Sequence, residues 1–238
     1  MKTISINIIA TNKYLSFVEG ISKSISKFFF PDCMIIIIVH SNLDIRNSHS
    51  NTDERIRYVH NFIEHEPWPY TTLKRFHYFV KAKEIITESD YSFYIDADSL
   101  FVGEIDIHTL PSSGLFGTIH PCLNEGCGTP ERNNSSTAYI PLGSNNKYFC
   151  GGFFGGSSRE FIKMSEKLSQ NIDKDLENGI IAIWHDESHI NNYFFHNPPS
   201  YIFEPPFAVA ENLTIQQESS KVKFLDKNLL GGHHFFRN

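Results

Sequence analysis

Cysteine, tryptophan and long apolar runs are scarce in this 238-residue sequence, which has 4 cysteines and 2 tryptophans. The apolar run "CMIIIIVH" (33–40) falls far short of the about 20 residues that a transmembrane helix needs. The opening "MKTISINIIATNKY" (1–14) has neither a long apolar core nor a small-residue cleavage site, which argues against a secretory signal. We therefore expect a soluble, cytoplasmic protein without a membrane anchor.

The few cysteines are Cys33, Cys122, Cys127 and Cys150. They do not make a short disulfide scaffold, and the pair at 122 and 127 fits no common zinc spacing with a second pair. Free thiols in a reducing compartment are the favoured interpretation.

Positive charge is also in deficit, since 21 Lys and Arg residues face 27 Asp and Glu residues, a net charge of −6. This balance excludes a bulk nucleic-acid binder, so we expect no nucleic-acid partner. The apolar content of 40% is ordinary for a globular protein of this length. Without a repeat or a clear linker, residues 1–238 are expected to form a single domain.

Strand-like and helix-like segments alternate in the first half of the chain. The sequence pattern predicts strands at 3–10, 34–40 and 56–63, and helices at 13–30 and 72–88. Such a series predicts an α/β fold with a mostly parallel central sheet flanked by helices. Ligands bind at the carboxyl ends of strands in these sheets.

A further strand ends in two acids, in "YSFYIDADSLFVG" (91–103). If the strand persists through Ala97, Asp96 and Asp98 point to one side, only ~7 Å apart. Two such charges are unfavourable unless a cation lies between them or one takes a proton. A divalent cation is one hypothesis, because hard cations choose carboxylate oxygen. Two solvated acids at a strand end are the alternative.

The second half is less regular. Residues 120–136 read as a long polar loop, and 147–161 as a strand whose paired glycines allow a close approach of backbone or ligand. Ser157 and Glu160 form a capping-box pattern, which predicts a helix through about residue 178.

Acids and histidines crowd into "WHDESH" (184–189). A charged helix start explains the acids. His185 and His189 have the spacing to share a metal, but the His-Glu-x-x-His order of zinc peptidases is not met. Glu187 beside Trp184 suits a sugar site, and a glutamate can act at a glycosidic centre.

Several short motifs occur together in one order. They are "IATNKY" (9–14), "WPYTTLKRF" (68–76), "YIDADSLF" (94–101), "LFGTIHP" (115–121), "AYIP" (138–141), "GGFFGG" (151–156) and "WHDESHINNYF" (184–194). In this combination the chain resembles glycosyltransferase family 6, the retaining enzymes that include the histo-blood-group A and B transferases and the α-1,3-galactosyltransferases. The resemblance runs to about Pro199 and implies a nucleotide-sugar-binding GT-A fold, with a nucleotide-binding half (1–103) and an acceptor-binding half (104–238).

The resemblance implies an activity and its residues. UDP-N-acetylgalactosamine or UDP-galactose is the implied donor, and a glycan ending in galactose the acceptor. Asp96 and Asp98 would hold Mn²⁺, with Mg²⁺ as the alternative, against the diphosphate, and Glu187 would be the catalytic residue. The implied donor-binding residues are Ile9, Ala10, Thr11, Tyr14, Trp68, Arg75, Asp96, Ala97, Asp98, Cys150, Gly151, Gly152, Asp186, Lys227 and Arg237. The implied acceptor-binding residues are His120, Thr129, Trp184 and Glu187.

Two features bear on the sugars. At the third position of 150–152, relatives that use N-acetylgalactosamine tend to have Gly and galactose users Ala, so Gly152 favours the larger sugar. The loop "HPCLNEGCGTPERN" (120–133) lacks the aromatic residues of relatives, although Thr129, Glu131 and Arg132 can still correspond, and "EPPFAVAEN" (204–212) lacks an acceptor-site aspartate. The acceptor therefore stays open, as does the choice between double displacement and a front-face mechanism.

Two other classes are compatible with parts of the sequence. "DADSL" (96–100) resembles the nucleophile motif of haloacid-dehalogenase-like phosphatases, although there it normally follows the first strand. A non-catalytic sugar-binding module is the second alternative.

Overall fold

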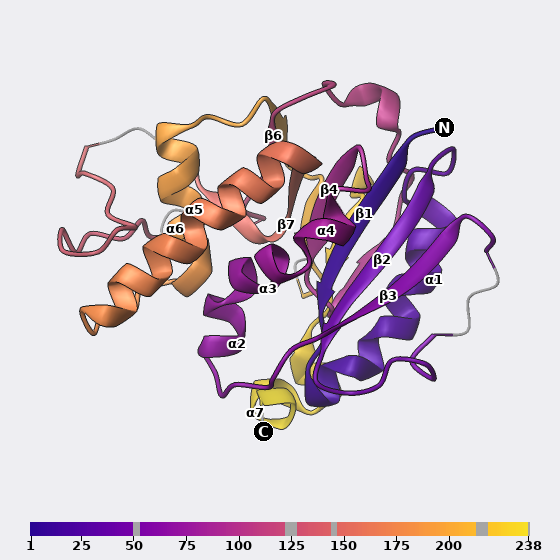
Figure 1. Ribbon diagram of the computed structural model, residues 1–238, viewed down its shortest axis with the longest axis horizontal. Helices are drawn as coiled ribbons and strands as arrows, with labels where there is room; N and C mark the ends of the chain where they lie inside the picture. Colours follow the sequence, from indigo (N-terminus) through magenta and orange to yellow (C-terminus); the bar gives the residue numbers. More distant parts are fainter. Residues whose placement is uncertain (50–52, 122–127, 144–146, 213–218, 238) are drawn as a thin grey trace.

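A seven-stranded sheet forms the centre of the protein in a computed structural model that describes residues 1–49, 53–121, 128–143, 147–212 and 219–237. The strand order is β3-β2-β1-β4-β7-β6-β8 (Figure 1). These strands are β1 (Thr3–Ile9), β2 (Met34–Ser41), β3 (Ile56–Phe62), β4 (Tyr91–Ile95), β6 (Leu115–Ile119), β7 (Phe149–Ser157) and β8 (Tyr201–Phe203). A small sheet, in the order β5-β10-β9, joins β5 (Ser99–Phe101), β9 (Ala208–Ala210) and β10 (Val222–Phe224).

The central sheet is mostly parallel, as the sequence predicts. β1 runs parallel to β2 and β4, β2 to β3, and β6 to β8, whereas β7 is antiparallel to both β4 and β6. The β4–β7 pair joins the two halves of the sequence in one sheet. The assignment of nucleotide to residues 1–103 and acceptor to 104–238 stays a prediction.

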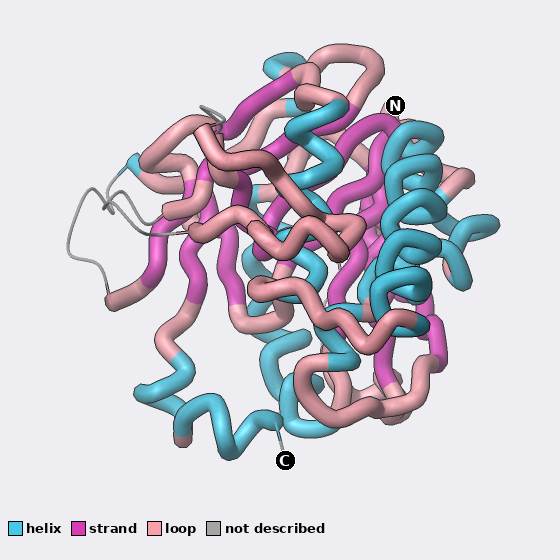
Figure 2. The backbone as a smooth tube through the Cα atoms, turned by 90° about the vertical axis from the view of Figure 1, so that its left-hand side faces the viewer, coloured by secondary structure: helices cyan, strands magenta, loops and turns pink. Residues whose placement is uncertain are grey.

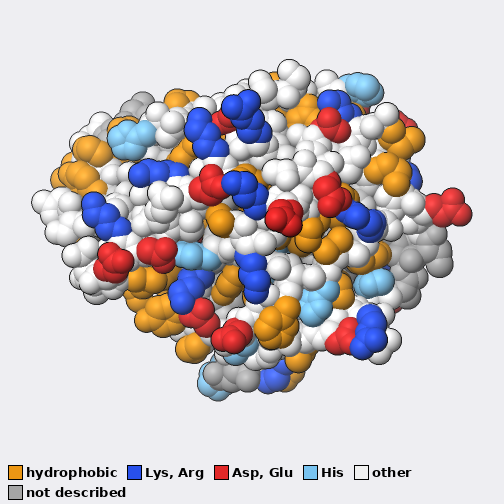
Figure 3. All heavy atoms as spheres, viewed as in Figure 1, with side chains coloured by type: hydrophobic (Ala, Val, Ile, Leu, Met, Phe, Trp, Pro, Cys, Tyr) orange, Lys and Arg blue, Asp and Glu red, His pale blue; other side chains and the backbone are white. Residues whose placement is uncertain are grey.

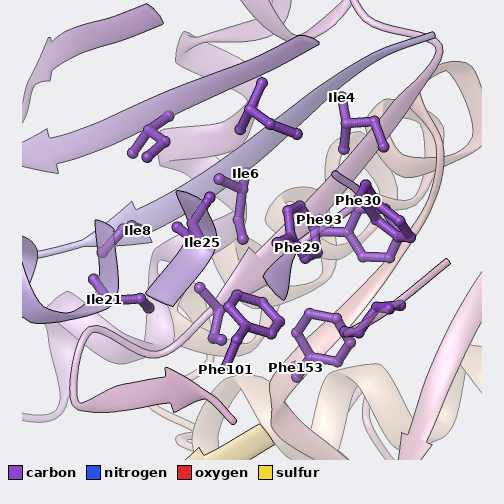
Figure 4. Close-up of a cluster of buried hydrophobic side chains, with 14 of the residues drawn as sticks. Ile4, Ile6, Ile8, Ile21, Ile25, Phe29, Phe30, Phe93, Phe101 and Phe153 are labelled. Carbon is purple, nitrogen blue, oxygen red and sulfur yellow. The ribbon is translucent and has the colours of Figure 1, made fainter. Parts of the chain in front are cut away.

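Helices cover both faces of this sheet (Figures 1 and 2). The elements are η1 (Asn12–Phe17), α1 (Val18–Phe28), α2 (Tyr70–Leu73), α3 (Arg75–Lys81), α4 (Lys83–Ile86), η2 (Ile107–Thr109), α5 (Ser158–Glu177), α6 (His185–His196), η4 (Lys227–Leu230) and α7 (Gly232–Arg237). α1 packs on one face, where Ile21 and Ile25 meet the isoleucines of β1 and a group of buried phenylalanines (Figure 4). α3, α4 and α5 cover the other face. Apolar strands buried from both sides explain the continuous runs of the sequence.

Two helices differ from expectation. The segment 13–30 is helical only in part, because it opens with the 3-10 helix η1, and Phe30 adopts the left-handed φ of 43°. The segment 72–88 is not one helix but three short ones, broken at Lys74 and Ala82. The two breaks let this segment follow the surface of the sheet. The spacing of apolar residues alone does not reveal such breaks.

The glycines of β7 do allow a close approach. A Cβ at Gly155 would lie 2.3 Å from Cδ1 of Phe93, so no side chain fits there. The capping box is wrong, however: Ser157 precedes α5 but its side chain makes no capping hydrogen bond. The N–H of Ser158 instead donates to the carbonyl of Asp90 at 3.1 Å, a tertiary partner that local sequence does not indicate.

Charges of both signs are interspersed on the face in Figure 3, with no continuous basic stripe there. Among the helices of the described residues, none combines the length and apolarity needed to cross a membrane.

Candidate active site

The Asp-Ala-Asp motif forms a turn and not the end of a strand. β4 stops at Ile95, and the N–H of Asp96 donates to the carbonyl of Gly152 at 2.9 Å before the chain turns into β5. The expectation that the strand persists through Ala97 is therefore wrong. The turn still places both acids at the carboxyl end of a central parallel strand, where α/β proteins bind ligands.

A pocket of about 500 Å³ opens at this edge. Most predicted site residues line it: Ile9, Thr11, Tyr14, Trp68, Arg75, Asp96, Ala97, Asp98, His120, Cys150, Gly151, Gly152, Trp184, Asp186, Glu187, Lys227 and Arg237. Ala10 and Thr129 do not, since Ala10 is fully buried behind the wall and Thr129 is exposed in the loop after residue 127. The size is typical of small-ligand sites.

Each acid of the motif has a cationic neighbour. Asp96 Oδ1 accepts a hydrogen bond from the Tyr94 hydroxyl at 2.6 Å and lies 3.6 Å from Nη2 of Arg75. Asp98 Oδ2 pairs with the ammonium group of Lys227. Desolvation in the pocket raises the pKa of Asp96, and the nearby Asp98 adds to this while Arg75 opposes it. The turn therefore favours additional positive charge.

The donor set fits a hard divalent cation. Within the described part of the chain, the side-chain hydrogen bonds to these acids reach Oδ1 of Asp96 and Oδ2 of Asp98, and none reaches Oδ2 of Asp96 or Oδ1 of Asp98. Gly152 keeps the first of these oxygens accessible, because a Cβ there would lie 3.0 Å from it. Carboxylate oxygens are the ligands that Mg²⁺ and Mn²⁺ prefer.

Arg75 connects the Asp-Ala-Asp turn to α6, because it contacts both Asp96 and Asp186. Its Nε lies 2.9 Å from Oδ2 of Asp186, although the N–H does not point at that oxygen, so the contact is an ion pair without a good hydrogen bond. The guanidinium also donates to the carbonyl of Gly151 and lies over the ring of Tyr94, 4.2 Å from its centroid. Burial raises the pKa of Asp186 to about 7, against the opposing effect of Arg75.

Glu187 lies in the first turn of α6 and is held from two sides. Its Oε1 accepts from the Tyr148 hydroxyl at 2.9 Å, and Oε2 accepts from the N–H of Gly151 at 2.7 Å. Both partners come from β7 or the residue before it. The carboxylate is therefore fixed in direction within the pocket wall, as a group that acts at one atom of a ligand must be.

The last described residues close one side of the pocket. Phe236 packs on Tyr14 with ring centroids 5.3 Å apart, and the Arg237 guanidinium lies 4.5 Å from the centroid of Trp68. Trp68 also meets His185 edge-on at 5.0 Å. Figure 1 shows this segment, α7, beside η1 at the start of α1. An aromatic rim with cationic groups suits a ligand with both sugar rings and negative charge.

The loop predicted at 120–136 is described only outside 122–127, so Cys122 and Cys127 lie outside the described residues. Glu131 accepts from the N–H of Ile183 at 2.7 Å, which links this loop to the segment before α6. His185 lines the pocket. His189 is buried with Nε2 3.8 Å from Oδ2 of Asp175, so the two histidines lie in different environments.

The model of the family described as glycosyltransferase family 6 matches residues 1–230. The chain belongs to this family.

Three relatives illustrate the range of similarity. The chain is 37% identical over 129 residues to the histo-blood group ABO system transferase 1 of Rattus norvegicus, which covers 53% of this chain and 36% of the relative. It is 32% identical over 145 residues to the O-antigen biosynthesis glycosyltransferase WbnI of Escherichia coli, covering 60% of this chain and 62% of the relative. It is 27% identical over 235 residues to the globoside alpha-1,3-N-acetylgalactosaminyltransferase 1 of Gallus gallus, covering 95% of this chain and 68% of the relative. The chain spans less than two thirds of the rat and bacterial proteins.

Sequence reasoning missed several pocket residues of this family member. They are His65, Glu66, Thr71, Thr72, Tyr94, Pro121, Ala210, Phe224 and Phe236. Thr71, Thr72, Tyr94 and Pro121 lie inside quoted motifs and could have been found. Phe224 and Phe236 come from segments after Pro199, where the motifs end, and only the fold brings them to the pocket.

Proposed function

We propose that this chain is a retaining α-1,3-glycosyltransferase that moves N-acetylgalactosamine from UDP-N-acetylgalactosamine to a glycan acceptor ending in galactose, with UDP-galactose as the second donor. The observation that supports this most is that a fixed carboxylate, Glu187, lines the same pocket as the Asp-Ala-Asp turn, in a chain of family 6.

The donor would bind with its diphosphate toward Asp96 and Asp98. Mn²⁺ held there would act as a Lewis acid on the departing UDP, and Mg²⁺ is the alternative ion. Lys227 and Arg237 line the same pocket and would stabilise the negative charge of the diphosphate. Tyr14 and Thr11 would contact the nucleoside.

The sugar would then lie between the turn and α6. Gly151 and Gly152 line the wall there, and their missing side chains leave room for a substituent on the sugar. Glu187 would stabilise positive charge at the anomeric carbon or attack that carbon, and both routes need the same fixed carboxylate. His120 and Trp184 would contact the acceptor.

The direct test measures UDP release from UDP-N-acetylgalactosamine and from UDP-galactose with Mn²⁺, in the presence and absence of an array of galactose-terminated oligosaccharides. We expect acceptor-dependent release and a product with an α-linkage, observed by NMR of the anomeric proton. Activity that is unchanged in EDTA would contradict the metal assignment. The variant with Asp96→Asn and Asp98→Asn should lose metal dependence together with most activity.

Two outcomes would favour other classes. Hydrolysis of p-nitrophenyl phosphate without any glycosyl transfer would indicate a phosphatase. Saturable binding of oligosaccharides with no turnover of either UDP-sugar would indicate a sugar-binding module.

A further inference from the structure

A second set of metal-binding groups lies in the pocket, apart from the Asp-Ala-Asp turn. His120 follows β6, Cys150 belongs to β7, and Glu187 lies in the first turn of α6. One ligand atom of each residue lies within 4.8 Å of the other two. Three separate elements thus bring an imidazole nitrogen, a sulfur and a carboxylate oxygen to one point.

The three ligand types select a particular kind of metal. Thiolate with imidazole and carboxylate suits Zn²⁺, whereas Mn²⁺ and Mg²⁺ prefer oxygen donors such as Asp96 and Asp98. Three protein ligands and one open position are typical of zinc sites that are accessible to small molecules. The open position here would face the pocket that all three residues line.

We propose that His120, Cys150 and Glu187 form an inhibitory zinc-binding site. Its metal-binding part stands on the side-chain geometry alone, and the inhibition rests on the proposed function. Zinc bound there would take Glu187 and His120 away from the sugars, so transfer would stop while the Asp-Ala-Asp turn still holds its own cation.

The ligands need only a small approach. A tetrahedral Zn²⁺ places its ligand atoms about 3.5 Å from one another, so the three atoms must draw together by up to about 1.3 Å. His120 is only partly buried, which leaves its side chain room to turn, whereas hydrogen bonds from Tyr148 and Gly151 hold Glu187 in place. Cys150 is buried in the strand and would stay in place.

Neighbouring hydrogen bonds already orient two of the ligands. The N–H of Gly152 donates to Sγ of Cys150 at 3.1 Å, and the Tyr148 hydroxyl donates to Oε1 of Glu187 at 2.9 Å. Such partners behind the ligands fix their direction and strengthen metal binding.

The charge balance also favours zinc. A free cysteine thiol is mostly protonated at neutral pH, so the sulfur carries a proton in the metal-free protein. On binding, the S–H bond breaks, the sulfur–zinc bond forms, and the proton leaves to solvent. The thiolate and the carboxylate then cancel the charge of Zn²⁺, so the buried site becomes neutral.

The test uses Co²⁺ as a spectroscopic substitute for Zn²⁺ in the full chain without substrates. A thiolate ligand gives a charge-transfer band in the near ultraviolet, and added Zn²⁺ should remove that band. Calorimetry in buffers of different ionisation enthalpy should show about one proton released per Zn²⁺ bound, as expected for one protonated thiol ligand.

Three variants locate the thiol. Cys150→Ser should lose the band and bind Zn²⁺ roughly 100-fold more weakly. Cys33→Ser, at a buried thiol outside the pocket, and the double variant Cys122→Ser with Cys127→Ser should both keep it. His120→Gln, which leaves every thiol intact, should keep the band at saturation with a weaker affinity, and this guards against a folding defect of Cys150→Ser.

Inhibition of sugar transfer is measured separately from metal binding. With Mn²⁺ in excess, Zn²⁺ should inhibit UDP release and compete with the acceptor, and Cys150→Ser should need a higher Zn²⁺ concentration for the same fractional inhibition. If the protein transfers no sugar, the Co²⁺ band still decides the site. A band that survives in Cys150→Ser, or that disappears only in the double variant, overturns the proposal.

Discussion

The ammonium group of Lys227 contacts the carboxylate of Asp98 across 129 positions of sequence. The lysine begins η4, and the pair is largely buried. Burial lowers the pKa of Lys227, but Asp98 outweighs this effect and the net pKa is raised, so the lysine is charged at neutral pH. A cation from the same chain therefore lies on one of the two acids that we assign to the metal.

This contact predicts a competition. Lys227→Met should raise the affinity of the donor-free protein for Mn²⁺ by roughly tenfold, about 1.4 kcal/mol, because the competing charge is gone. The same change should raise KM for the UDP-sugar, because a cation for the diphosphate is lost. Titration with Mn²⁺ followed by electron paramagnetic resonance measures the first effect.

The matched control is Lys223→Met, whose ammonium lies 3.5 Å from Glu211 and not in the pocket. It should leave the Mn²⁺ affinity unchanged. Weaker Mn²⁺ binding by Lys227→Met would show that the lysine and the metal do not compete.

Glu187→Gln should lower kcat by about 100-fold or more and leave KM for the donor within a few-fold, the pattern for a group that acts mainly in the transition state. The amide is close in size to the carboxylate but carries no charge. Steady-state kinetics with one donor and one acceptor give both constants. Glu166→Gln, on the exposed side of α5, is the control, and near-normal turnover of Glu187→Gln would limit that residue to a structural role.

Gly152→Ala should lower the preference for UDP-N-acetylgalactosamine over UDP-galactose by ~5- to 150-fold, because overpacking costs roughly 1–3 kcal/mol. The structure adds a complication, since a Cβ there would lie 2.6 Å from Cε1 of Phe224. The methyl group would therefore push the ring and reduce turnover of both donors.

A second substitution separates these effects. Phe224→Leu in the Gly152→Ala background should recover turnover with UDP-galactose but not the lost preference. The measurement is kcat/KM for both donors on the unmodified protein, Gly152→Ala and the double variant. An unmodified protein that prefers UDP-galactose, or an unchanged donor ratio in Gly152→Ala, contradicts the assignment.

His40 should make the protein lose stability in acid. It is fully buried in β2, where Nε2 lies 3.0 Å from Oδ1 of Asn7 and Nδ1 lies 2.8 Å from Nδ2 of Asn61. Burial lowers the pKa of His40 to about 3. Below the unfolded value of about 6.5 the unfolded chain takes a proton and the folded chain does not, so the free energy of unfolding falls as pH falls towards 3, by up to about 1.4 kcal/mol per pH unit.

Urea unfolding at several pH values from 7.5 to 4.5 measures this slope. His40→Gln should flatten it, and the exposed His108→Gln should not. Equal slopes in the two variants would mean that His40 does not carry the effect.

Local sequence patterns predicted the buried strands well, because a strand buried on both faces consists of consecutive apolar residues. The predicted strand 34–40 becomes β2 with one added residue, and 3–10 becomes β1 with one residue fewer. The Asp-Ala-Asp turn could not be found this way. Its direction depends on Gly152 pairing with Asp96 and on β10 pairing with β5, and both partners are far away in sequence.

The same limit applies to the site. The acids, Arg75 and the glycines stood out by type and motif. Tyr148, which donates to Glu187, did not, because a single tyrosine before a strand carries no local signal for that contact. The family resemblance implied Lys227 as a donor-binding residue, but its contact with Asp98 came only from the fold.

The packing of α7 divides the pocket into parts of unequal local stability. Lys13 Nζ donates to the carbonyl of Phe235 at 2.9 Å, and this contact joins residues 222 positions apart, whereas the floor is built from the central sheet. Within α7, Phe236 is the one buried residue, so little apolar burial holds this helix in place. Amide hydrogens of α7 should therefore exchange through local opening, long before those of β1 and β4, which need the sheet itself to unfold.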